Sequence, residues 1–136
     1  MNMKAFEWND DLSVGVQEID EDHKKIIKYY NELFAACMVS MGPAVVLETL
    51  EKLIEYTKCH FQREEALMEK EGYPGLAEQR HEHEELIRTV EEVQKKAKSD
   101  PDHEFSNDVL GFVSSWIRNH ILESDLALAR YIRAKH

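Results

Sequence analysis

The stretch VLETLEKLIEYTKCHFQREEALM, residues 46–68, carries the pattern that determines the fold. Its apolar residues return at alternating spacings of three and four, which is the period of an amphipathic α-helix. The resulting face carries Val46, Leu50, Leu53, Thr57, His60, Glu64 and Leu67. The stretch therefore predicts a helix that buries one face, and it places two ionisable residues, His60 and Glu64, on that buried face.

Three further segments show the same spacing, and turn-forming residues separate the segments at Gly42-Pro43, at 72–75 and at 99–102. We therefore expect an all-α fold, an antiparallel up-down-up-down four-helix bundle with an extended N-terminal arm and a short C-terminal helix. The expected single domain, 1–136, comprises an arm over 1–17, helices over about 18–39, 43–70, 74–98 and 103–122, and a tail helix over about 125–134.

Composition excludes several classes of function. The chain has 136 residues and a formal net charge of −10, so nucleic acid and anionic membranes are not expected partners. Its apolar runs are far shorter than the roughly 20 residues that cross a bilayer. The first residues, Met1 to Asp11, contain Trp8 and acids and lack the apolar core of a secretion signal. We therefore expect a cytoplasmic protein.

Polar residues interrupt all four apolar faces. A single histidine on such a face is more often an ordinary core or boundary residue than a ligand. A buried, unpaired carboxylate costs several kcal/mol, however, and imidazoles together with carboxylates are common metal ligands. The joint pattern therefore predicts a metal site, in which each helix supplies at least one ligand. The interrupting residues are His23, His60, Glu64, His83 and His120.

Asp125 is a further candidate ligand, but its spacing is unfavourable. It follows His120 by five residues, which in a regular α-helix turns the two side chains apart by about 140°. We expect the helix to end or bend near 122–124, so that Asp125 can reach the same centre. His81 lies two residues from His83, on the opposite side of the predicted helix, and is expected to face water.

These residues also resemble those of the bacterial hemerythrin family over nearly the whole chain. The resemblance rests on a combination of short stretches whose residues and order are specific. They are Trp8-Asn9, Leu12 to Val16, Ile19-Asp20 with His23, residues 60–65 with Met68, Tyr73-Pro74-Gly75 with His83, and residues 116–121 with Asp125.

The resemblance implies two non-heme iron ions with a bridging oxo or hydroxo group. His23 and His60 would hold the iron that is open to dioxygen, His83 and His120 would hold the second iron, and Glu64 and Asp125 would bridge the pair. The family binds dioxygen as a hydroperoxide at the open iron, for carriage, storage or delivery, and a redox partner protein is compatible with this chemistry. Apolar walls protect the bound oxygen, and the expected wall residues are Phe61, Trp116 and Ile117.

The chain departs from the family at Gln79, where the family has a further histidine four residues before His83. The amide oxygen of Gln79 could fill that position, Gln79 could hold a water there, or the position could stay vacant. The departure leaves two alternatives to oxygen carriage. One is an oxidase, peroxidase or nitric oxide-reactive enzyme with both irons open, and the other is a metal-binding bundle with an incomplete site.

Overall fold

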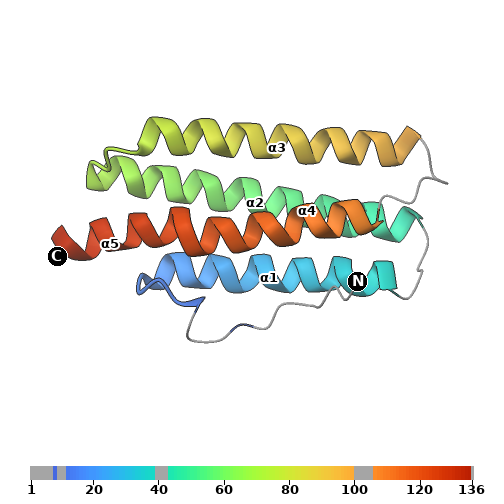
Figure 1. Ribbon diagram of the computed structural model, residues 1–136, viewed down its shortest axis with the longest axis horizontal. Coiled ribbons are helices and arrows are strands. Elements are labelled where there is room, and N and C mark those ends of the chain that lie inside the picture. The colour runs from blue at the N-terminus through green and yellow to red at the C-terminus, as the bar shows by residue number, and fades with distance from the viewer. Residues whose placement is uncertain (1–7, 9–11, 39–42, 100–105, 136) are drawn as a thin grey trace.

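The computed structural model describes residues 8, 12–38, 43–99 and 106–135, and these residues form a bundle of long helices (Figure 1). The chain turns back on itself between successive long helices, so that each runs antiparallel to the one before it. The elements are α1 (Gln17–Met38), α2 (Pro43–Glu71), α3 (Leu76–Ser99), α4 (Ser106–Asn119), a π-helical segment η2 (His120–Asp125) and α5 (Leu126–Lys135).

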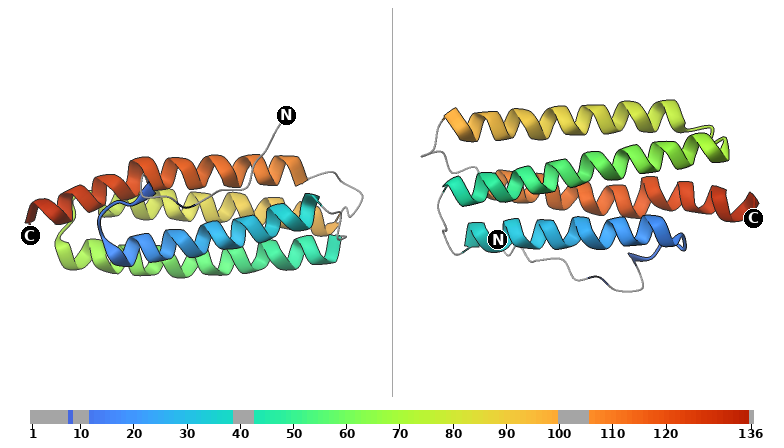
Figure 2. Two further views of the ribbon diagram at one scale, coloured as in Figure 1. Left: turned by 90° about the horizontal axis from the view of Figure 1, so that it is seen from below. Right: turned by 180° about the vertical axis from the view of Figure 1, so that it is seen from behind.

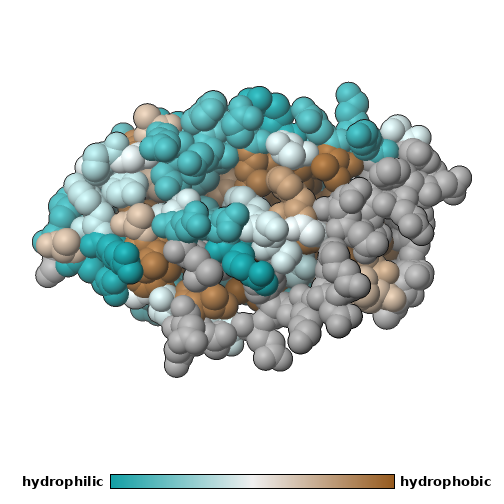
Figure 3. Space-filling model, viewed as in Figure 1, coloured by the Kyte–Doolittle hydropathy of each residue, from teal (hydrophilic) through white to brown (hydrophobic). Residues whose placement is uncertain are grey.

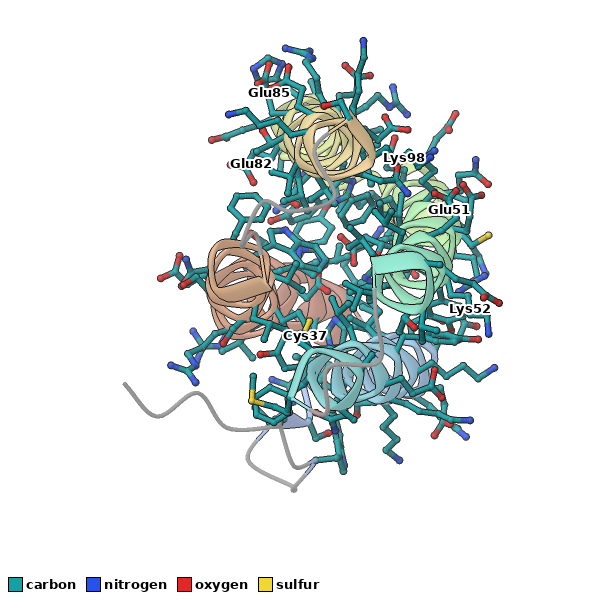
Figure 4. All side chains as sticks on the ribbon, turned by 90° about the vertical axis from the view of Figure 1, so that its right-hand side faces the viewer. Cys37, Glu51, Lys52, Glu82, Glu85 and Lys98 are labelled. Carbon is teal, nitrogen blue, oxygen red and sulfur yellow. The ribbon has the colours of Figure 1, made fainter. Side chains whose placement is uncertain are left out.

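The four long helices surround a common axis. Viewed along that axis, α1 lies between α2 and α4, and α3 lies across the bundle from α1 (Figure 4). Charged side chains such as Lys52 and Glu85 point away from the axis in the same view. The predicted all-α, up-down-up-down four-helix bundle is thereby confirmed, and the view from below shows the same arrangement (Figure 2).

The C-terminal part of the chain differs from the sequence expectation. In place of a fourth helix that stops near residue 122 and a separate tail helix, α4 continues through η2 directly into α5. A π-helical turn accommodates an extra residue without breaking the helix, so no separating loop is needed. α3 begins at Leu76 and not at the expected residue 74, and the expected start at residue 103 lies outside the described part of the chain.

The turn between α2 and α3 explains why α2 ends where it does. The amide of Gly72 donates to the carbonyl of Glu69 at 3.2 Å, and the amide of Tyr73 donates to that of Met68 at 2.9 Å. This pairing closes a helix end when the first residue beyond it has a positive φ, and Gly72 adopts φ 64°. Lys135 donates to the carbonyl of Glu71 at 2.6 Å, so the end of α5 is tied to this turn.

The buried apolar residues form two clusters on either side of a polar layer. The larger cluster includes Ile26, Leu50 and Leu110, and the smaller one includes Met68 and Leu128. Along α1 the order is an apolar residue of the smaller cluster, then His23, then the larger cluster. The bundle therefore holds its buried histidines and carboxylates in a layer between two apolar regions.

The described part of the N-terminal arm packs on both clusters. Trp8 contacts the larger cluster, whereas Val14 belongs to the smaller one. The carboxylate of Asp20 accepts hydrogen bonds from the Ser13 hydroxyl at 2.6 Å and from the Val14 amide at 2.9 Å. These bonds fix the turn that leads from the arm into α1. Of the expected arm, residues 1–7 and 9–11 lie outside the described residues.

The outer surface is largely hydrophilic along α3, whereas apolar side chains show between the helices (Figure 3). None of the helices in the part of the chain that the structure describes combines the length and the apolar character needed to span a bilayer.

The larger cluster makes a prediction about stability. Leu50 has no exposed surface, so Leu50→Ala should leave a cavity and lower the free energy of unfolding by about 3 kcal/mol. Leu47→Ala, on the same helix at a partly buried position, should cost clearly less. Urea unfolding followed by circular dichroism measures both. Equal losses for the two variants would contradict the assignment of Leu50 to the core.

Candidate metal centre

Six ionisable side chains meet in the layer between the two apolar clusters. They come from all four helices of the bundle, and each is at most 5% exposed. α1 supplies His23, α2 supplies His60 and Glu64, α3 supplies His83, and η2 supplies His120 and Asp125. These are the six residues that the sequence predicted as metal ligands, and the structure brings all of them to one place.

The π-helical segment brings Asp125 to the centre. In a π-helix the hydrogen bond spans five residues, so residues five apart lie above one another on one face. His120 and Asp125 are the first and last residues of η2, and their Nε2 and Oδ2 atoms lie 2.7 Å apart. The expected end or bend near residues 122–124 is therefore replaced by a continuous helix with a wider turn, which solves the same spacing problem.

The donor atoms of five of these residues lie very close together. One ligand atom from each of His23, His60, Glu64, His120 and Asp125 lies within 4.8 Å of all the others. The His60 Nε2 atom is 2.9 Å from Glu64 Oε2 and 3.2 Å from His120 Nε2, and His23 Nε2 contacts Asp125 Oδ2. This density of nitrogen and carboxylate oxygen atoms is typical of a site built for cations.

His83 joins the group from the α3 side. Its Nε2 atom lies 3.3 Å from Glu64 Oε1, while His120 Nε2 lies 3.4 Å from the other oxygen, Glu64 Oε2. The His83 and His120 rings are neighbours, with centroids 5.7 Å apart, and the His23 and His60 rings are neighbours at 5.3 Å. The two oxygens of Glu64 therefore face histidine nitrogens from two different elements, α3 and η2.

Two of the histidines are oriented by carboxylates outside the layer. His60 Nδ1 donates to Asp22 at 2.8 Å, and Asp22 also accepts from Arg63 at 2.7 Å and from the Tyr56 hydroxyl at 2.8 Å. With Nδ1 protonated, the lone pair of Nε2 points into the centre, which is the orientation that a metal needs.

The second histidine is held in the same way. His83 Nδ1 donates to Glu65 at 3.0 Å, and Glu65 accepts from Arg80 at 2.8 Å. Sequence reasoning missed Asp22 and Glu65 because both lie off the apolar faces. One signal was available: each arginine lies three residues from its histidine on the same helix, Arg63 after His60 and Arg80 before His83.

Electrostatics hold the acids in their charged form. Burial raises the pKa of Glu64, as does the Asp125 charge, but His120 and His60 outweigh both and lower it to about 2. Burial also opposes ionisation of Asp125, whose neighbours His120, His23 and His60 lower its pKa well below the ordinary value. The centre therefore contains two buried, negatively charged carboxylates, and these charges stabilise positive charge on neighbouring groups.

The histidines respond in the opposite sense. Burial disfavours the charged form of His120, yet Asp125 and Glu64 raise its pKa to about 9. Burial likewise lowers the pKa of His60, but its carboxylate neighbours Asp125, Asp22 and Glu64 raise it well above the ordinary value. The protons on His60 and His120 thus neutralise the buried carboxylates, as the positive charge of a bound metal cation would.

Whether the layer fits a metal is tested by its unsatisfied atoms. Buried polar atoms normally have hydrogen-bond partners, and each exception needs an explanation. In the described part of the chain, such exceptions gather at this layer, and they include Glu64 Oε1 and Oε2, Asp125 Oδ1, His83 Nε2, His23 Nδ1 and Gln79 Oε1. The residues fit a metal centre, because cations would satisfy several of these carboxylate and imidazole atoms at once.

Aromatic rings pack on two of the candidate ligands, His83 and His120. Phe61 stacks on His83 with centroids 3.8 Å apart, and Trp116 stacks on His120 at 4.9 Å. Ile117 is buried in the larger cluster, three residues before His120. The predicted wall residues are thus buried or pack on ligand candidates: Trp116 stacks on His120, and Phe61 stacks on His83 and also lies beside His60, with ring centroids 5.8 Å apart.

Two openings lead from the surface to the layer. A groove of about 620 Å³ between α1 and α2 reaches His60 and Glu64, and a hollow of about 220 Å³ between α3 and α4 reaches His83 and His120. The layer is therefore approachable from both sides. Gln79, four residues before His83 on α3, is buried, whereas His81 is exposed, as expected from its position on the helix.

The chain is similar to known hemerythrins in both sequence and structure. The family model of the hemerythrin HHE cation binding domain matches residues 14–132. The chain is 36% identical to the bacteriohemerythrin of Stenotrophomonas maltophilia over 132 residues, which are 97% of this chain and 84% of that protein. It is 28% identical to the myohemerythrin of Theromyzon tessulatum over 122 residues, which are 90% of this chain and 89% of that protein.

A solved structure shows the same relationship. A crystal structure of a hemerythrin mutant superposes with a TM-score of 0.85 at 28% sequence identity, covering 95% of this chain and 98% of the other. The family match extends over most of the chain and includes all six residues of the buried layer. The chain belongs to the hemerythrin family.

Proposed function

We propose that this protein holds a pair of iron ions and binds dioxygen at them, as an oxygen carrier, store or donor. Family membership and the His, Glu and Asp cluster support an iron-binding protein of the hemerythrin type. The observation that carries the proposal is the buried layer itself, in which two carboxylates and four imidazoles converge and several of their donor atoms have no protein partner.

The arrangement supports a division of the donors between two ions. By the family resemblance, His23 and His60 would hold one ion and His83 and His120 the other. The rings of each pair are neighbours, as are those of His60 and His120 across the two pairs. Glu64 and Asp125 would bridge the pair, since each has oxygen atoms close to more than one histidine. When bound, iron supplies an electron-donating, Lewis-acidic position for dioxygen.

Other residues of the chain would orient the ligands and limit the access of water to the centre. Asp22 and Glu65 hold His60 and His83 in the tautomer whose Nε2 lone pair faces the centre. Phe61 and Trp116 place apolar ring surface against His83 and His120, which limits the contact of water with these ligands. An apolar cavity of about 20 Å³ adjoins Trp116 and offers space to a small apolar molecule such as dioxygen.

A second candidate function is an oxidase or peroxidase. The observation that favours it is the hollow beside His83 and His120, because it makes that half of the centre reachable from solvent as well. Peroxide or dioxygen could then approach both metal positions, and a redox partner protein would have to supply electrons for turnover.

Removing one histidine tests the metal assignment. His83→Ala should lose iron, because His83 supplies one of the buried donors, whereas His81→Ala should keep the wild-type content of two irons per chain. His81 is the matched control, since it lies on the same helix and is exposed. Metal analysis and the near-ultraviolet absorption of the air-exposed proteins measure the effect. A wild-type protein that contains only zinc, or a His83→Ala variant with full iron content, would contradict the assignment.

Oxygen binding itself is tested by reversibility. The reduced iron protein, mixed with dioxygen in a stopped-flow instrument, should form an oxygenated spectrum that disappears on purging with nitrogen. The buried layer and its aromatic cover are the reason, since they exclude the water that would otherwise promote irreversible oxidation. Immediate irreversible oxidation combined with steady consumption of peroxide would instead support the oxidase or peroxidase function.

The orienting carboxylate of His60 provides a further test. Asp22→Asn removes the negative charge that holds His60 Nδ1–H, and it should weaken metal binding by roughly 10- to 100-fold. Competition with a chelator measures the affinity. Glu21→Gln is the control, because the neighbouring Glu21 is exposed and pairs with Lys24. An affinity that is the same for Asp22→Asn and the wild type would show that Asp22 does not position this ligand.

A further inference from the structure

α3 contains two buried glutamines whose surroundings differ. Gln79 is 8% exposed and Gln94 is 7% exposed, so both amides have left water to nearly the same extent. The side-chain amide of Gln94 donates to the carboxylate of Glu51 on α2. The Oε1 atom of Gln79, in contrast, is buried without any hydrogen-bond partner. Leaving a buried acceptor unsatisfied is unfavourable, so the burial of this atom calls for a partner that the protein side chains do not supply.

The position of Gln79 indicates what that partner is. Gln79 precedes His83 by four residues on a regular helix, so the two side chains project from the same face. The backbone amide of Gln79 bonds to the carbonyl of Gly75 at 3.0 Å, which shows that the first turn of α3 is already helical there. His83 Nε2 is likewise buried without a hydrogen-bond partner, 3.3 Å from Glu64 Oε1.

The unsatisfied atoms of Gln79, His83 and Glu64 therefore belong to the same part of the molecule. Carboxamide oxygens are established oxygen ligands of hard cations, and they add no charge to a centre whose carboxylates already balance positive charge. We propose that the Gln79 side-chain oxygen is a metal ligand on the His83 side of the centre. The inference rests on the proposed metal centre and assigns to it a neutral oxygen donor from α3.

The assignment has a consequence for the two ions. The ion on the His83 side would then have one amide oxygen among its protein ligands. Its other protein ligands would be imidazoles and carboxylates. An amide oxygen is a weaker donor than imidazole toward iron, so this ion should exchange faster than its neighbour. Substitution at Gln79 should therefore alter one of the two ions and leave the other in place.

The test compares Gln79→Leu, Gln79→His and the control Gln94→Leu, each loaded with iron. Release of iron to an excess of chelator is followed by absorbance, and X-ray absorption reports the ligands. Gln79→Leu should release one of its two ions at least about tenfold faster than the wild type. Gln79→His should release that ion more slowly than the wild type and show added imidazole scattering, and Gln94→Leu should behave as the wild type. Circular dichroism on each protein checks that the bundle is intact.

The outcomes separate this inference from the proposed function. If the wild type holds two irons and Gln79→Leu releases them at the wild-type rate, Gln79 is not a ligand although the metal centre stands. If Gln79→Leu and Gln94→Leu accelerate release equally, the effect is one of stability, and the assignment is wrong. A wild-type protein that binds no iron would overturn the proposed function, and the role of Gln79 with it.

Discussion

The structure depends on one constraint, the burial of two carboxylates in the centre of a helical bundle. Glu64 and Asp125 are almost completely removed from water, and an isolated carboxylate in such a place would cost several kcal/mol or take up a proton. His60 and His120 lower the pKa of both acids, and His23 also lowers that of Asp125, so the charges persist. Everything else about the layer follows from the need to keep these charges paired.

The fold meets this constraint with elements from every part of the chain. Two apolar clusters lie on either side of the layer, and the helices α1, α2 and α3 each deliver a histidine to it. The π-helical segment allows His120 and Asp125 to face the same way and lets α5 continue to the turn beyond α2. Asp22 and Glu65 then fix the direction of two of the imidazoles. The contacts that hold the helices together in this layer thus also set the positions of the candidate ligands.

Much of the fold and of the buried layer could be predicted from the sequence, because both obey local periodicity. A spacing of three and four gives the helices, and polar residues in that register, such as His60 and Glu64, must lie inside. The π-helical segment could not be predicted, since its extra residue is tolerated only where tertiary contacts hold Asp125 at the centre. Asp22 and Glu65 were missed for a related reason: their partners lie on other helices, and on their own helices they resemble ordinary surface acids.

The pairing of histidines with particular ions, and the nature of the ions, stay predictions that depend on the same buried carboxylates. The most direct measurement is anomalous X-ray diffraction at the iron absorption edge from crystals of the iron-loaded protein. The account predicts two adjacent anomalous peaks inside the bundle, one beside His23 and His60 and one beside His83 and His120, with Glu64 and Asp125 between them. A single peak, or peaks confined to the protein surface, would contradict it.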